Sequence, residues 1–245
     1  MTRSLPLQSR EPMFNAPAIV VWLLALLVLV HVGLSLLSDR VWSEAIETLA
    51  LIPARYSGYA SEIAGGRVAA VTSLVTYQLV HGDIAHLGIN SAWLLAFGSA
   101  VARRLGTARF LLFAVLSGIA GALTFLAFHI GENTIMVGAS GALAGLMGGA
   151  FRFLFSAFDD GGAEAFRGDQ RLIRRMSLGE VFRDRRAQLA IGFWIAINFA
   201  TALAAPLITS AGGIAWEAHL GGFAFGLLLF GVFDRPEPAP NPMLR

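Results

Sequence analysis

The chain contains neither cysteine nor lysine, and it carries few charges of either sign. Only 14% of its 245 residues are charged, against roughly a quarter in a soluble domain, and 56% are hydrophobic. Without cysteine the protein can form no disulfide, thiolate metal site or cysteine nucleophile. All eighteen basic residues are arginine and the formal net charge is only +2, so the composition does not indicate nucleic-acid binding. A mean hydropathy of +0.66 instead predicts an integral membrane protein.

Six apolar segments are long enough to be membrane helices. The first, residues 16–37, follows two arginines as a signal peptide does, but it is longer than a signal peptide's hydrophobic region, so we interpret it as a retained helix. The sequence therefore predicts an all-α polytopic membrane protein built as a six-helix bundle. The other five segments cover residues 87–101, 110–128, 138–155, 189–208 and 214–233.

The arginines are distributed unevenly between the two sides of these segments. Fifteen of the eighteen fall on the side that holds both termini, and the other three fall in the first loop. Because positive residues are enriched on the cytoplasmic side of membrane proteins, we expect both termini to be cytoplasmic.

The expected membrane domain covers residues 16–233, between an N-terminal tail at 1–15 and a proline-rich tail at 234–245. Its first loop, residues 38–83, has the pattern of an amphipathic helix lying in the membrane interface, although a soluble cap fits nearly as well. The connection at residues 158–186 is rich in arginine. It is either a contact for lipid headgroups or a protein partner, or a solvated topology anchor.

The fourth segment places a serine among small residues. Gly141, Gly145 and Gly149 recur every four residues, so on a helix they form a smooth ridge beside Ser140. This small-xxx-small spacing lets a second helix approach closely in lipid. Taken alone, such a serine is most often a packing residue.

The second segment carries polar side chains on one helix face. His86 and Asn90 are four residues apart and point the same way, while His81 lies before or at the helix start. Buried donors need partners, and asparagine is a poor ligand for soft metals, so no metal site is expected here. A developing oxyanion is a better partner for these donors.

The sixth segment supplies a candidate base. His219, Gly222 and Gly226 share one helix face, and the two glycines complement the ridge beside Ser140. The fourth and sixth helices begin on the same side, so Ser140 and His219 should lie at similar depth, as a nucleophile and its base require. No carboxylate stands behind the histidine at helical spacing, which predicts a Ser/His dyad rather than a triad.

The three motifs together resemble those of the rhomboid intramembrane serine proteases. The resemblance covers about residues 16–233 and is carried, in the family's order, by His81-x4-His86-x3-Asn90, Gly138-Ala-Ser140-Gly141 and Ala218-His219-x2-Gly222-x3-Gly226.

The resemblance implies roles for these residues. Ser140 would be the nucleophile and His219 the general base. The oxyanion would be held by His86, Asn90 and the Ser140 backbone N–H, and the remaining motif residues would support the site: His81, Gly138, Gly141, Gly222 and Gly226. It also implies a bacterial-type protein of the inner membrane that needs no cofactor. This protein would cleave transmembrane substrates, admitted past the fifth helix, in an active site open to the outer face.

A departure from the family at the position that would orient the base, and three alternative functions, accompany this interpretation. Some members have an aromatic residue that stacks on the catalytic histidine, but Ala144 stands at that position, so another side chain must orient His219. The chain could instead be a non-catalytic rhomboid-like binder of transmembrane clients or, less readily, a transporter. A haem protein could use a histidine pair drawn from His31, His81, His86, His129 and His219.

Overall fold

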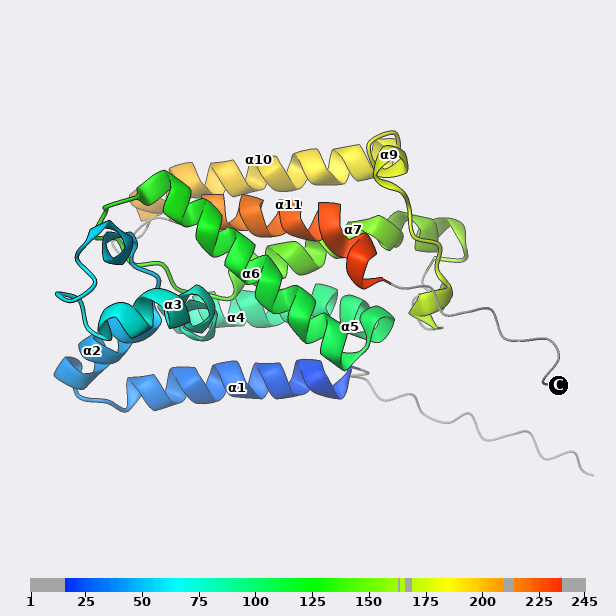
Figure 1. The fold of residues 1–245 in the computed structure, drawn as a ribbon. Helices are drawn as coiled ribbons and strands as arrows, with labels where there is room; N and C mark the ends of the chain where they lie inside the picture. The colour runs from blue at the N-terminus through cyan, green and yellow to red at the C-terminus, as the bar shows by residue number, and fades with distance from the viewer. Residues whose placement is uncertain (1–15, 163, 166–168, 209–213, 235–245) are drawn as a thin grey trace, which may run out of the picture.

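Helices dominate the part of the chain that the computed structural model describes, which is residues 16–162, 164–165, 169–208 and 214–234. The expected tails, apart from Asp234, lie outside these residues. The α-helices, labelled as in Figure 1, are α1 (Ala18–Ser35), α2 (Asp39–Leu49), α3 (Gly66–Thr76), α4 (Ile84–Trp93), α5 (Ser99–Leu105), α6 (Thr107–His129), α7 (Ser140–Asp159), α9 (Leu178–Val181), α10 (Arg185–Ile208) and α11 (Trp216–Phe233). Short 3-10 turns lie at Pro53–Ser57, Tyr77–Leu79 and Gln170–Leu172, and a π-helical turn at Leu94–Gly98 joins α4 to α5.

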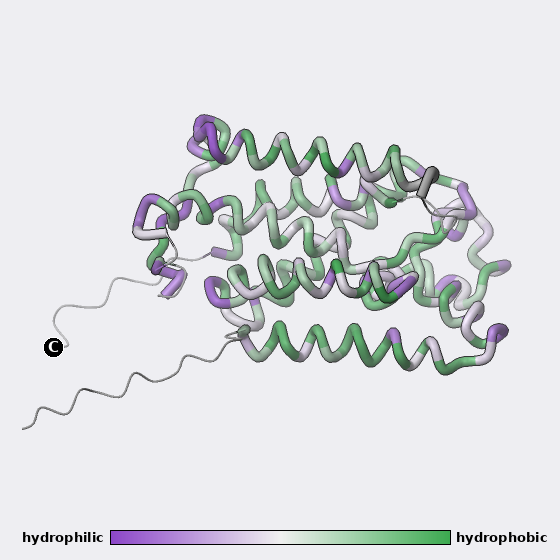
Figure 2. Tube along the Cα trace, turned by 180° about the vertical axis from the view of Figure 1, so that it is seen from behind, coloured by the Kyte–Doolittle hydropathy of each residue, from purple (hydrophilic) through white to green (hydrophobic). Residues whose placement is uncertain are grey.

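Six helical stretches within the described residues are long and apolar enough to cross a membrane. They are α1, the continuous α4 to α5 helix, α6, α7, α10 and α11. Figure 2 shows apolar residues along the middle of these helices and polar residues gathered at the two ends of the bundle. The predicted all-α bundle of six apolar helices is thus confirmed, and the chain is an integral membrane protein.

The fourth apolar helix begins later than its sequence predicts. Gly138 has a φ of +115°, which lies outside the helical region and is accessible mainly to glycine. The helix therefore starts at Ser140. The second apolar helix is longer than expected and spans residues 84–105.

The helix α7 lies at the centre of the bundle. Some 89% of its apolar window is buried inside the protein, whereas 11% is buried for α1 and for α10. These two helices lie at opposite edges of the bundle, with α6, α7 and α11 between them (Figure 1). The central position of α7 requires its neighbours to pack on glycines and other small residues.

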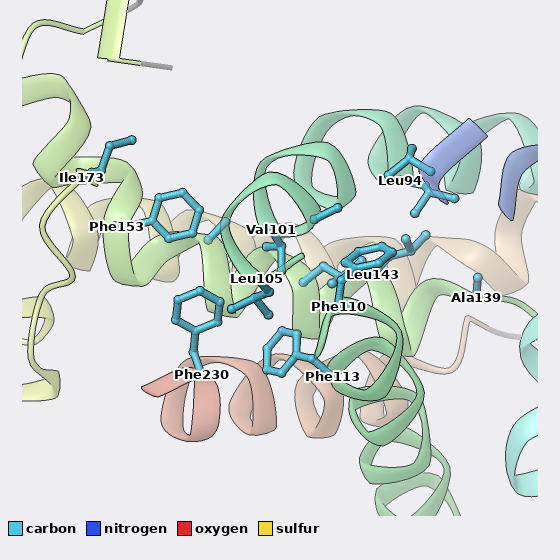
Figure 3. Packing of buried hydrophobic residues seen from close by; sticks show 14 of the residues in the cluster. Leu94, Val101, Leu105, Phe110, Phe113, Ala139, Leu143, Phe153, Ile173 and Phe230 are labelled. Atoms are coloured by element: carbon cyan, nitrogen blue, oxygen red, sulfur yellow. The ribbon is translucent and has the colours of Figure 1, made fainter. Parts of the chain in front are cut away.

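Aromatic side chains pack together at the end of the bundle where α11 finishes (Figure 3). Phe230 meets Phe113 edge to face at a centroid distance of 5.6 Å and stacks on Phe153 at 5.7 Å, which links α6, α7 and α11. All three rings are fully buried.

Buried arginines fasten the connection between α7 and α10 to this end. Arg104 donates to both carboxylate oxygens of Asp234, at 2.9 and 3.0 Å, and to the carbonyls of Gln170 and Ile173. Arg152 donates to the carbonyl of Met176 at 2.9 Å. Gln170, Ile173 and Met176 are buried, while Arg171, Leu172 and Arg174 between them are exposed. This part of residues 158–186 is therefore fastened to the bundle and only partly solvated.

The first loop supports the opposite end, and its amphipathic segment forms α2 as predicted. Leu51 and Met136 exchange backbone hydrogen bonds of 3.0 and 2.9 Å, and the Gly138 N–H donates to the Tyr77 carbonyl at 2.9 Å. Buried Arg55 holds the loop together by donating to backbone carbonyls of that same loop. The loop thus fixes the segment that leads into Ser140.

Candidate active site

Ser140 and His219 meet through their side chains. Ser140 is the first residue of α7, and His219 lies in the first turn of α11. The distance between Ser140 Oγ and His219 Nε2 is 2.7 Å, the length of a normal hydrogen bond. The arrangement predicted for these two side chains is therefore present.

Glycines on both helices allow this approach. A Cβ atom added to Gly222 would overlap the carbonyl oxygen of Gly141, and one added to Gly226 would overlap the carbonyl of Gly145. The first two glycines of the expected ridge approach the α11 backbone, whereas Gly149 faces two rings, that of Phe230 on α11 and that of Phe113 on α6. Gly148, from the neighbouring row, completes the contact with α11. The two helices therefore touch through their backbones over two turns.

The His86 ring lies against the turn that precedes Ser140. A Cβ at Gly138 would lie 2.6 Å from His86 Cε1 and Nε2, so the glycine leaves room for the imidazole. The Asp83 side chain caps α4 by accepting from the His86 backbone N–H at 2.8 Å. The cap fixes the first turn of α4, from which the ring projects.

Asn90 is buried on the same face, one turn further along α4. Its Nδ2 donates to the His86 carbonyl at 2.9 Å, which leaves a second amide hydrogen for another acceptor. The expected grouping of His86 and Asn90 on one face is therefore present, and one Asn90 donor is occupied within its own helix.

His81 precedes α4 and is buried, with an exposed fraction of 4%. Its ring contacts the His86 ring edge to face, with centroids 5.1 Å apart. Neither of its ring nitrogens has a hydrogen-bond partner among the described residues. The structure brings His81 to His86, but no hydrogen bond in the described part of the chain links it to Ser140 or His219.

Asn198 is a site residue that the sequence did not reveal. It lies on α10, and its Oδ1 is 2.8 Å from His219 Nδ1, while its Nδ2 donates to the Trp216 carbonyl at 3.1 Å. The only signal in the sequence was a single amide within an apolar run. Asn198 therefore contacts His219 on the ring nitrogen that Ser140 does not use.

Glu217 is the carboxylate nearest in sequence to His219, but it pairs with a different histidine. Glu217 Oε1 lies 3.1 Å from Nε2 of His129, whose Nδ1 lies 2.7 Å from Glu132. The group behind His219 is thus an amide, in agreement with the expected lack of a carboxylate.

The contacts of the histidines do not favour a haem site. His81 lies against His86, His129 pairs with two glutamates, and His219 contacts Ser140 and Asn198.

The hydrogen bonds define which nitrogen of His219 can act as a base. The Nδ1–H donates to the Asn198 carbonyl oxygen, so Nε2 carries the lone pair and accepts from the Ser140 hydroxyl. A serine with an unprotonated imidazole at 2.7 Å is suited to transfer its proton as it attacks an electrophile.

Comparisons with known proteins agree with the motifs. The family described as "Rhomboid domain" matches residues 69–235. A stretch of 76 residues is 42% identical to the Bacillus subtilis (strain 168) protein named "Putative rhomboid protease YdcA". This match covers 31% of the chain and 37% of the relative's length, so the relative is similar over about a third of each protein.

Proposed function

The chain belongs to the rhomboid family, and on that premise we propose that it is an intramembrane serine endopeptidase. Its substrates would be membrane proteins, cleaved in or next to a transmembrane segment. The observation that carries the proposal is the 2.7 Å contact between Ser140 Oγ and His219 Nε2, formed inside a bundle of apolar helices.

In the proposed reaction the Ser140 oxygen attacks the carbonyl carbon of the scissile peptide bond, and its proton passes to His219 Nε2. The tetrahedral intermediate collapses when the protonated histidine gives this proton to the leaving amine. Water, deprotonated by the same nitrogen, then attacks the acyl carbonyl, and His219 returns that proton to Ser140 Oγ as the acid product leaves. The histidine therefore acts first as a base and then as an acid.

The oxyanion formed in these steps needs hydrogen-bond donors. We assign this role to the Ser140 backbone N–H, which is free because it opens α7, to the His86 ring, and to the second amide hydrogen of Asn90. The support for His86 is its position against Gly138, two residues before the nucleophile. Each such donor contributes about 2.7–4 kcal/mol to transition-state stabilisation in comparable sites.

The distribution of charge supports a proposal for the orientation in the membrane. The start of α1 and the end of α11 lie at the same end of the bundle (Figure 1). Arginines gather there, since Arg104, Arg109 and Arg175 donate to Phe233 or Asp234. We propose that this end faces the cytoplasm of a bacterial cell. Ser140, at the opposite end of α7, would then be reached from the outer face of the inner membrane, where water is available.

The experiment that tests the function uses purified protein in liposomes with a reporter containing one transmembrane segment. Wild-type protein is expected to cleave the reporter, and Ser140→Ala to reduce cleavage to background. A fluorophosphonate probe is expected to label the wild-type protein on Ser140, which tests the nucleophile independently of substrate choice.

Ser156→Ala is the matched control. It removes a buried hydroxyl from the same helix, far from His219, and its hydroxyl has no hydrogen-bond partner among the described residues. It is expected to cleave and to be labelled like wild type. Cleavage that persists in Ser140→Ala, or wild-type protein that neither cleaves nor reacts with the probe, would overturn the proposal.

A further inference from the structure

Asn198 stands out on a helix that is otherwise exposed. Among the α10 residues whose side chains are described, 185–204, only Ala187 and Asn198 are buried. An amide in the middle of an apolar membrane helix is unfavourable unless its hydrogen bonds are satisfied by a neighbour. Here the neighbour is α11, through the two hydrogen bonds described above.

These two hydrogen bonds fix the orientation of the amide. Since Nδ2 donates to the Trp216 carbonyl, Oδ1 must point to His219, where it can only accept. An acceptor at Nδ1 selects the imidazole tautomer that has its hydrogen on Nδ1 and its lone pair on Nε2. This is the tautomer that Ser140 requires.

The helix that holds this amide packs loosely. Apart from Asn198, α10 meets α11 through aromatic side chains: Trp194 stacks on Phe223 at a centroid distance of 4.3 Å, and Phe199 lies 4.8 Å from Trp216. None of these contacts joins backbone to backbone, in contrast to the glycine contacts between α7 and α11. A shift of α10 by a few ångströms would break the Asn198 hydrogen bond while Ser140 and His219 stayed in place.

We propose that Asn198 is a positioning residue for His219 and that it makes the histidine a competent base only while α10 is docked on α11. This inference rests on the proposed protease function. The other ionisable group that acts on His219 is His86 of α4, while Glu217 is directed to His129. Among the residues that the structure describes, no carboxylate competes with the amide for the Nδ1 hydrogen.

The first test measures the proton position directly. In protein labelled with 15N-histidine, His219 of the wild type is expected to carry its hydrogen on Nδ1 at neutral pH, and Asn198→Ala to give a mixture of tautomers. This readout needs no substrate. A wild-type protein that fails to cleave would therefore refute the protease function without deciding the tautomer, and an unchanged tautomer in Asn198→Ala would refute the role of Asn198 alone.

The second test is kinetic. Asn198→Ala is expected to lower kcat about 10- to 100-fold with KM nearly unchanged, because one oriented hydrogen bond to the base is lost. Asn198→Asp keeps an acceptor and adds a negative charge, so it is expected to recover part of kcat and to move the acidic limb of the pH profile upward. Phe193→Ala, at an exposed position of α10, is the control expected to match wild type. Wild-type kcat in Asn198→Ala, or an unmoved limb in Asn198→Asp, would overturn the positioning role.

The third test concerns docking. Trp194→Ala removes an aromatic contact between α10 and α11 without touching the amide, and it is expected to lower kcat in the wild-type background. In the Asn198→Ala background the same change is expected to have little further effect, because the link it weakens is already absent. Equal losses in both backgrounds would show that docking does not act through Asn198.

Discussion

Two helices contribute side chains to the same site but contact the rest of the protein very differently. Most of α7, which carries Ser140, is enclosed by its neighbours, whereas α10, which carries Asn198, is mostly exposed. The distance between Ser140 and His219 is fixed by backbone contacts that no side-chain rotation can relax. The hydrogen bond between His219 Nδ1 and Asn198 depends on α10, which a few side chains hold against α11. The comparison indicates that the two sides of the candidate site differ in how tightly they are packed.

The largest effect is expected from a methyl group placed between α7 and α11. In Gly226→Ala the new Cβ would overlap the Gly145 carbonyl and lie 2.8 Å from Gly145 Cα, so the helices must separate. We expect a loss of about 3 kcal/mol in the free energy of unfolding, at the upper end of the usual range for overpacking, together with most of the cleavage activity.

The matched change on α10 is Gly192→Ala. Among the described residues no atom outside the helix's own nearby backbone lies within 4 Å of the added Cβ, so stability in detergent and cleavage are expected to match wild type or improve slightly. Thermal unfolding of both variants, with cleavage assays, measures the difference. Equal destabilisation at the two positions would contradict the contrast in packing.

A second prediction compares one arginine on each helix. Arg152 of α7 is 5% exposed and donates to the Leu227 carbonyl at 2.8 Å, while Arg186 of α10 forms an exposed ion pair with Asp159. Arg152→Met is expected to lower the free energy of unfolding by about 2 kcal/mol, because buried carbonyls lose their donor. Arg186→Gln is expected to lower it by less than about 1 kcal/mol, as is typical of surface pairs.

Denaturation in mixed micelles would measure both changes. The prediction for α7 fails if Arg152→Met is as stable as wild type, and the prediction for α10 fails if Arg186→Gln is the more damaging of the two.

The smallest effect is expected in the connection that joins the two helices. The Ser177 backbone N–H, followed by Arg174 and the Ser177 side chain, lowers the pKa of Glu180 to about 2, against an ordinary value of about 4.3. Because the pKa is depressed in the folded state, the stabilisation is complete above about pH 5 and is lost as the pH falls toward 2. The Glu180 side chain is 43% exposed, so the contribution is small.

Unfolding of wild type and Glu180→Gln between pH 6 and pH 3 would test this. The stability difference between the two proteins is expected to shrink as the pH falls, and a difference that stays constant over this interval would contradict the assignment.

Much of the architecture could be predicted from the sequence, because the length of an apolar run and the helical spacing of small residues are local properties. The approach of Ser140 to His219 followed from glycines on both helices, whose spacing allows only a few ways of packing. The roles of these residues in cleavage remain a proposal, as do those of His86 and Asn90.

Features that depend on how one helix is rotated against another could not be predicted. Ala144 indicated that some side chain must replace the usual aromatic residue, but nothing in the periodicity of residues 189–208 directs Asn198 toward α11 rather than toward lipid. The sequence marks Arg104 and Arg152 only as arginines on the cytoplasmic side. A count of charges by side cannot distinguish these buried guanidinium groups from solvated ones. The late start of α7 depends on the φ angle of Gly138, which its neighbours determine.

The beginning of α7 at Ser140 also has an electrostatic consequence. The aligned peptide dipoles of a helix place about half a positive charge at its first turn and half a negative charge at its last. Because α7 is enclosed by apolar neighbours, little solvent screens this field along its length. The backbone therefore presents positive potential at Ser140, where negative charge would develop during the proposed attack on a carbonyl. This potential comes from peptide dipoles and not from an ionised side chain. At the other end, the negative pole near Asp159 is balanced by Arg186 from α10.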